Sequence, residues 1–62
     1  MDNMDTYNNM LNMIDNLTET LNSVITETIH EKDLTRKMEL IQYKQDLRKR
    51  INAYKNAIMD LV

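Results

Sequence analysis

The fold of this chain is decided by residues 30–33, the polar sequence HEKD, which separates two stretches of regular apolar spacing. Before and after it, apolar residues recur in steps of three and four, the pattern of an amphipathic helix. The two patterns are out of heptad phase, because the first register puts core positions at Thr28 and Thr35 and the second puts one at Lys37. We therefore expect a turn at about residues 30–33, with Asp33 or Thr35 capping a new helix.

Toward the N-terminus, the first apolar stripe holds for three heptads. Its members are Met4, Tyr7, Met10, Ile14, Leu17, Leu21 and Val24. Six asparagines fall off the stripe, and asparagine is a mediocre helix former. Tertiary packing rather than intrinsic propensity therefore has to hold this first helix, which we expect over about residues 3–29.

Toward the C-terminus, a second stripe has the same spacing. Its members are Leu40, Leu47, Ile51, Tyr54, Ile58 and Leu61, and Lys44 stands where one more apolar residue would fall. The two stripes predict an all-α fold, a single domain over residues 1–62 built as an antiparallel helical hairpin with its second helix at about 34–61. One continuous helix of about 90 Å, at 1.5 Å per residue, is the alternative, because no Gly or Pro interrupts the pattern.

The composition excludes several other classes of protein. Without Gly or Pro, tight β-hairpin turns are disfavoured and Gly-rich phosphate-binding loops are ruled out. Without Cys, there is no disulfide, thiol nucleophile or cysteine-ligated metal. Asn, Ile, Lys and Tyr make up 22 of the 62 residues, a bias typical of AT-rich genomes, so we expect a phage, a plasmid or a low-GC bacterium as the source.

The location in the cell is predicted from two observations. No apolar run approaches the roughly 18 residues that a membrane-spanning helix needs. The N-terminal sequence MDNMD is acidic where a secretory signal peptide would be basic. We therefore expect an intracellular, cytoplasmic protein with no membrane partner.

Charge is divided between the two halves of the chain. Residues 1–31 contain six acidic residues and no Lys or Arg, whereas residues 32–62 contain all eight basic residues and four acidic ones. The net charge of −2 conceals this asymmetry. An acidic helix folded against a basic helix is attracted to it, which supports the hairpin.

Self-association is expected because a hairpin of this size has little core of its own. Domains below about 70–80 residues usually need disulfides, metals or oligomerisation. The second helix also carries an additional apolar row, Leu34, Met38 and Ile41, roughly 100–140° around the helix from the main stripe. A helix with two apolar faces needs two neighbours, so we predict a homodimer that forms a four-helix bundle.

The same additional row is our candidate for a partner-binding surface. It is flanked by Lys37 and Lys44, and an apolar patch with charged neighbours is typical of protein-binding sites. The alternative is that the row seals the end of the hairpin by packing against apolar residues of the first helix. Those residues are Val24, Ile25 and Ile29.

No constellation of residues predicts catalysis, a cofactor or a metal. Ser23 and His30, the single serine and the single histidine, stand about 10 Å apart along a helix, beyond hydrogen-bond reach. Glu27 and His30 have the Glu-x-x-His spacing of dicarboxylate metal bundles, and Glu39 would be the added carboxylate. These residues lie off the apolar stripe, whereas metal ligands of such bundles project inward. We expect a solvated helix end and no enzyme.

Nucleic-acid binding is the second function class that the sequence permits. It would use the basic face of the second helix, which consists of Lys37, Lys44, Arg48 and Lys55. Tyr43 would stack on a base. The negative net charge and the acidic first helix oppose this reading, because they neutralise the field of the basic face.

One segment is similar to a known family of helical hairpins. Residues 45–47 (QDL), followed by Ile51, Asn52 and Tyr54, resemble the second helix of the small aspartyl-phosphate phosphatases of sporulating bacteria. That family has a Ser-Gln-x-Leu-Asp core, but here Lys44 stands at the serine position and Arg48 at the aspartate position. The resemblance therefore implies a hairpin shape and not the phosphatase activity.

The function that we expect from the sequence is a non-enzymatic protein–protein interaction module. It would be a small helical homodimer that regulates or inhibits an unidentified protein, and, if phage- or plasmid-encoded, it would act on a host factor. The alternative is a nucleic-acid-binding hairpin dimer that uses the basic face of the second helix.

Overall fold

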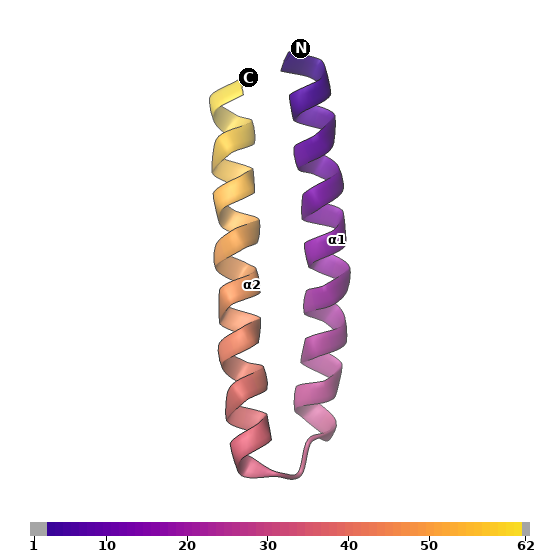
Figure 1. The fold of residues 1–62 in the computed structure, drawn as a ribbon, viewed down its shortest axis with the longest axis vertical. Helices are drawn as coiled ribbons and strands as arrows, with labels where there is room; N and C mark the ends of the chain where they lie inside the picture. The colour runs from indigo at the N-terminus through magenta and orange to yellow at the C-terminus, as the bar shows by residue number, and fades with distance from the viewer. Residues whose placement is uncertain (1–2, 62) are drawn as a thin grey trace.

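The computed structural model describes residues 3–61 and confirms the all-α helical hairpin (Figure 1). Helix α1 covers Asn3–His30 and helix α2 covers Leu34–Leu61, each with 28 residues. The helices run antiparallel and side by side, and the hairpin measures 47 × 15 × 14 Å. One continuous helix of about 90 Å is therefore not the fold of this chain.

The turn is one residue shorter than expected, because His30 remains in α1. The carboxylate of Glu31 accepts hydrogen bonds from the backbone N–H groups of Lys32 and Asp33, each at 3.1 Å. None of the described residues has a positive φ. The chain thus reverses direction without glycine, and a side-chain carboxylate supplies the acceptor that holds the turn.

Asp33 is the N-cap of α2. Its Oδ1 accepts hydrogen bonds from the backbone N–H of Thr35 at 2.9 Å and of Arg36 at 3.4 Å. Its carbonyl oxygen accepts the N–H of Lys37 at 2.8 Å, the first bond of the helix. Thr35, the other capping candidate, lies inside α2.

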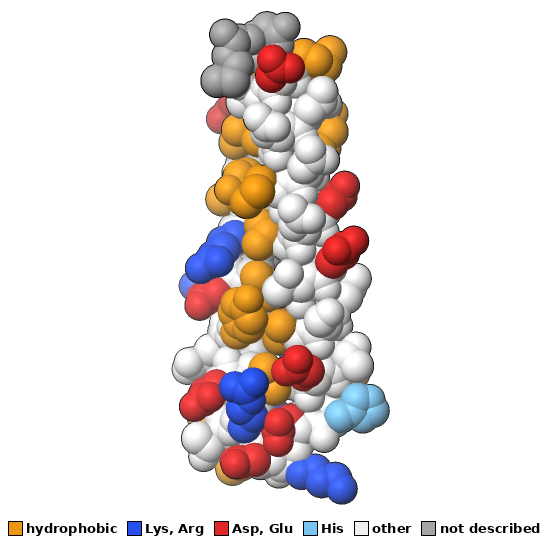
Figure 2. Space-filling view, turned by 45° about the vertical axis from the view of Figure 1, so that its right-hand side comes forward, with side chains coloured by type: hydrophobic (Ala, Val, Ile, Leu, Met, Phe, Trp, Pro, Cys, Tyr) orange, Lys and Arg blue, Asp and Glu red, His pale blue; other side chains and the backbone are white. Residues whose placement is uncertain are grey.

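The core lies in the seam where the two stripes meet. Its buried apolar side chains are Val24, Leu40, Leu47 and Ile51, with Leu47 only 1% exposed. Leu17 and Leu21 pack against this cluster. Six of the remaining stripe residues toward the ends are half-buried: Tyr7, Met10, Ile14, Tyr54, Ile58 and Leu61. Met4, which the apolar spacing places in the first stripe, is instead 64% exposed, because it falls at an e position of the register that Tyr7 begins. Figure 2 shows orange side chains following this seam on the side that it presents.

Two kinds of polar residue occupy core positions near the turn. Thr28 is buried, and its hydroxyl donates a 2.7 Å hydrogen bond to the carbonyl oxygen of Val24, so no polar atom is left without a partner there. Lys37 and Lys44 are half-buried. Long lysine stems cover apolar surface while the ammonium groups reach water. The core positions near the turn are therefore filled partly by polar and charged residues, whose apolar atoms help to cover the seam.

Candidate interaction surfaces

The side chains next to the seam form two different surfaces, one on each side of the hairpin. We assign position a of the first heptad register to Tyr7, Ile14 and Leu21, and position a of the second to Ile51 and Ile58. In an antiparallel pair, the e positions of both helices then lie on one side of the seam and the g positions of both helices lie on the other. A groove of about 290 Å³ opens on the e side. It is lined by Thr18, Leu21, Arg48, Ile51, Asn52 and Lys55.

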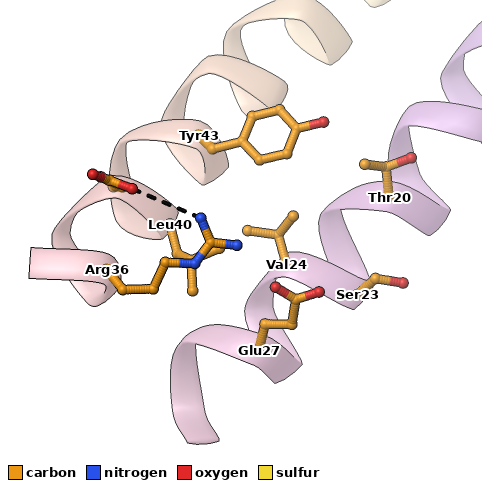
Figure 3. A pocket seen from close by; sticks show the side chains of 8 residues that line it. Thr20, Ser23, Val24, Glu27, Arg36, Leu40 and Tyr43 are labelled. Atoms are coloured by element: carbon orange, nitrogen blue, oxygen red, sulfur yellow. Dashed lines mark ion pairs between the residues drawn. The ribbon is translucent and has the colours of Figure 1, made fainter. Parts of the chain in front are cut away.

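The opposite side carries a pocket of about 390 Å³ between the helices (Figure 3). It is lined by Thr20, Ser23, Val24, Glu27, Arg36, Glu39, Leu40 and Tyr43. Four of these residues occupy g positions, which places the pocket on the side away from the groove. We call the side that holds the groove, with the e and b positions of both helices, the lateral surface. We call the opposite side, with the g positions, the pocket side.

Exposed apolar side chains gather on the lateral surface. Among the described residues, eight large apolar side chains are exposed, and six of them occupy e or b positions on this side. The six are Met4, Leu11, Ile29, Leu34, Met38 and Met59. All except Leu11 are between 56% and 72% exposed. Met13 and Tyr43 belong to the pocket side. These side chains form two apolar groups on one side of the hairpin, one near the turn and one toward the far end, and exposed apolar groups of this kind are typical of interaction surfaces.

The candidate patch near the turn lies on this lateral surface. Leu34 and Met38 are exposed and Ile41 is half-buried. Among the first-helix residues that would seal the patch, Val24 lies in the core, Ile25 is half-buried and Ile29 is exposed. At the turn end of the hairpin, Ile29, Leu34 and Met38 therefore remain exposed, while Ile25 and Ile41 are partly covered.

The basic residues of α2 are spread around the helix. Lys37 and Lys44 are half-buried at core positions, whereas Arg48 and Lys55 line the groove. Lys49 and Arg50 are exposed at f and g positions, which face away from the groove. The basic side chains of α2 therefore form no single stripe.

The pocket side brings together the acidic residues considered for metal binding. Arg36 pairs with Glu39, its Nη1 lying 3.7 Å from Oε2, and Figure 3 shows Arg36 and Glu27 reaching into the pocket from different helices. No group of three or more metal-binding side chains occurs in the part of the chain that the structure describes. Ser23 lines the pocket but His30 does not. The pocket thus does not bring together Ser23 and His30, the pair considered from the sequence.

Some members of the lateral surface were missed by the sequence analysis. Ile29 and Met59 are exposed at b positions, and Thr18 and Asn52 line the groove. Their signal was present in the heptad positions, since e and b residues of both registers share one side of the hairpin. This shared side can be recognised only when the two helices are aligned with each other as an antiparallel pair.

In comparisons with known proteins, no family model, curated protein or solved structure matches this chain. Within residues 3–61, neither helix has a stretch long and apolar enough to span a membrane.

Proposed function

We propose that this chain is a non-enzymatic protein–protein interaction module that works as a homodimeric four-helix bundle and regulates or inhibits another protein. One observation carries the proposal: six large apolar side chains are exposed together on the lateral surface. Burying a side chain of this kind in an interface contributes about 1.5–3 kcal/mol. Exposing this side of the hairpin to water is thus unfavourable, and burying it against another protein surface is favourable.

The thin core supports the same proposal. Among the described residues, only four apolar side chains are buried: Val24, Leu40, Leu47 and Ile51. Small domains with so few buried side chains commonly gain stability from a partner subunit. A second hairpin would cover apolar residues that the first leaves in water, and two hairpins packed side by side make a four-helix bundle.

Nucleic-acid binding has less support from the same surface. The groove places Arg48 and Lys55 beside apolar side chains, and the remaining basic residues point elsewhere around α2. Phosphate recognition needs basic groups gathered along one track. A gel-shift titration at increasing salt separates the two functions: tight binding of DNA or RNA with a steep dependence on salt would contradict the proposed function.

The test of the homodimer is thermal unfolding at several protein concentrations. Because association stabilises the folded state by mass action, the melting temperature should rise as concentration increases. Changing Leu34→Glu together with Met38→Glu should abolish this dependence while far-UV circular dichroism stays helical. Met13→Glu, an exposed apolar residue of the pocket side, is the matched control. A melting temperature independent of concentration in the unmodified chain would contradict the homodimer.

The regulatory part of the proposal needs a second assay. Affinity capture from the organism that encodes the chain should retain a specific protein on the unmodified bait. The variant Met38→Glu with Ile41→Glu, which alters the candidate patch, should lose that protein, because it disrupts the homodimer that we propose the partner recognises. Equal capture by both baits would show that the lateral surface has no part in recognition.

A further inference from the structure

We propose that a second copy of this chain docks on the lateral surface with the two hairpins parallel, turn beside turn, so that α1 of each copy lies over α2 of the other. This inference rests on the homodimer of the proposed function. It adds the face that is buried and the direction of packing, neither of which the homodimer alone defines.

Only two symmetric ways of pairing the lateral surface bring the helices nearly parallel to each other. A closed dimer has a twofold axis, and for face-to-face hairpins this axis lies in the interface plane, either along the hairpin or across it. An axis along the hairpin stacks α1 on the partner's α2 at the same level. An axis across the hairpin stacks each helix on its own copy in the opposite direction.

Residues at the same level follow from the turn. His30 ends α1 where Leu34 begins α2, and both helices rise 1.5 Å per residue. The numbers of two level residues therefore add to about 64, and Asn3 lies level with Leu61 at the far end. In the parallel dimer, a residue of α1 meets the residues of the second copy's α2 at that level.

The apolar residues match at both ends in the parallel arrangement. Near the turn, Ile29 lies level with Leu34 and Met38 of the second copy, all three being more than half exposed in the single hairpin. At the far end, Met4 lies level with Met59 of the second copy. Every one of these side chains would therefore leave water on dimerisation, which is the main favourable term in association.

Polar residues in the middle of the lateral surface also meet complementary residues of the second copy in the parallel dimer. Asp15, at a b position of α1, lies level with Arg48 of the second copy, which lines the groove of α2. The twofold axis gives two such acid–base contacts per dimer. Farther toward the turn, Asn22 of α1 lies within about one helical turn of the level of Gln45 of the second copy. The acidic first helix thus meets the basic second helix between copies, as it does within one hairpin.

The antiparallel arrangement also brings apolar side chains together, because Met4 then lies level with Ile29 of the second copy and Met59 lies level with Leu34 and Met38. It differs from the parallel arrangement in the charges that it places together. With the axis across the middle of the hairpin, Arg48 lies opposite Arg48 of the second copy, so two guanidinium groups repel each other at the centre. Ile41 then lies beside Lys55 of the second copy, which exposes an apolar side chain to an ammonium group. Both directions match the exposed apolar residues, so the charge pairing of Asp15 with Arg48 is what favours the parallel dimer.

Electron–electron distance measurements between spin labels test the direction of packing. The chain has no cysteine, so Lys32→Cys at the turn or Asp60→Cys near the far end gives a single labelling site. In the parallel dimer, each site should show a label-to-label distance below about 30 Å, because bundle helices lie about 10 Å apart. Glu19→Cys, midway along α1, is the control, since its distance barely depends on direction.

Each outcome of that measurement has a separate meaning. Distances that reach or exceed the 47 Å length of the hairpin at both ends would overturn the parallel direction while leaving the homodimer intact. The absence of dipolar coupling at all three sites, at concentrations well above micromolar, would overturn the homodimer itself.

A charge exchange tests the face and the pairing together. Asp15→Arg or Arg48→Asp alone turns two attractions per dimer into two repulsions and should weaken dimerisation about tenfold. The double variant, Asp15→Arg with Arg48→Asp, should restore the dissociation constant. Lys49→Glu, an exposed position on the outer side of α2, is the matched control and should change little. A dimer strengthened by Arg48→Asp alone, or a double variant as weak as the single ones, would overturn the proposed pairing.

Discussion

At the scale of the residue, Asp33 shows how one side chain sets where α2 begins. Its Oδ1 accepts two backbone N–H groups of the first turn that would otherwise have no partner in the helix. Replacing Asp33 with Ala should therefore lower the free energy of unfolding by about 1 kcal/mol, measured by urea denaturation. Asp33→Asn keeps the capping oxygen and is the control. An equal loss of unfolding free energy in the two variants would show that the hydrogen bonds to the capping oxygen are not the source of the stabilisation.

Leu47 is the residue on which the core depends most. It is 1% exposed and lies in the cluster of Val24 and Leu40. Leu47→Ala should lower the free energy of unfolding by about 2–5 kcal/mol, since it removes buried methyl groups and leaves a cavity. Met13→Ala, on the exposed pocket side, should cost much less when both are measured at one protein concentration. A similar loss in both would contradict the seam as the centre of stability.

At the scale of the element, α1 is held by packing and not by its own composition. Asn8, Asn9, Asn12, Asn16 and Asn22 are exposed. Four threonine hydroxyls of α1 donate hydrogen bonds to the carbonyl oxygen four residues earlier. Asn12 lies at an f position, away from both the seam and the lateral surface. Asn12→Ala should thus raise the free energy of unfolding by roughly 0.5 kcal/mol, measured by urea denaturation. A loss of stability would instead indicate an unrecognised contact of this asparagine.

The helices and their inward faces were predictable from apolar spacing, whereas the turn was predictable only in part. The phase break and the polar stretch located the turn, and Asp33 was one of two expected caps. The use of Glu31 as a side-chain acceptor for the turn depends on backbone geometry that no spacing pattern encodes. The side chain of Asp33 caps α2, and the ion pair near the turn joins Arg36 to Glu39.

At the scale of the whole molecule, the lateral surface required both helices to be seen together. The row of Leu34, Met38 and Ile41 was visible in the sequence, because it repeats on one helix. The contributions of Ile29 and Met4 come from the other helix, and they join the row only through the antiparallel register. The proposed function is built on this surface, because exposed apolar residues indicate an interface.

Sedimentation equilibrium tests the central claim most directly, because it measures mass without reference to shape. The single chain has a mass of 7.4 kDa. We predict that, at micromolar concentrations and physiological salt, the protein sediments with twice that mass and dissociates on dilution. Far-UV circular dichroism at the same concentrations should remain helical. A folded species that keeps the mass of one chain throughout this range would contradict the claim that the hairpin works as a homodimer.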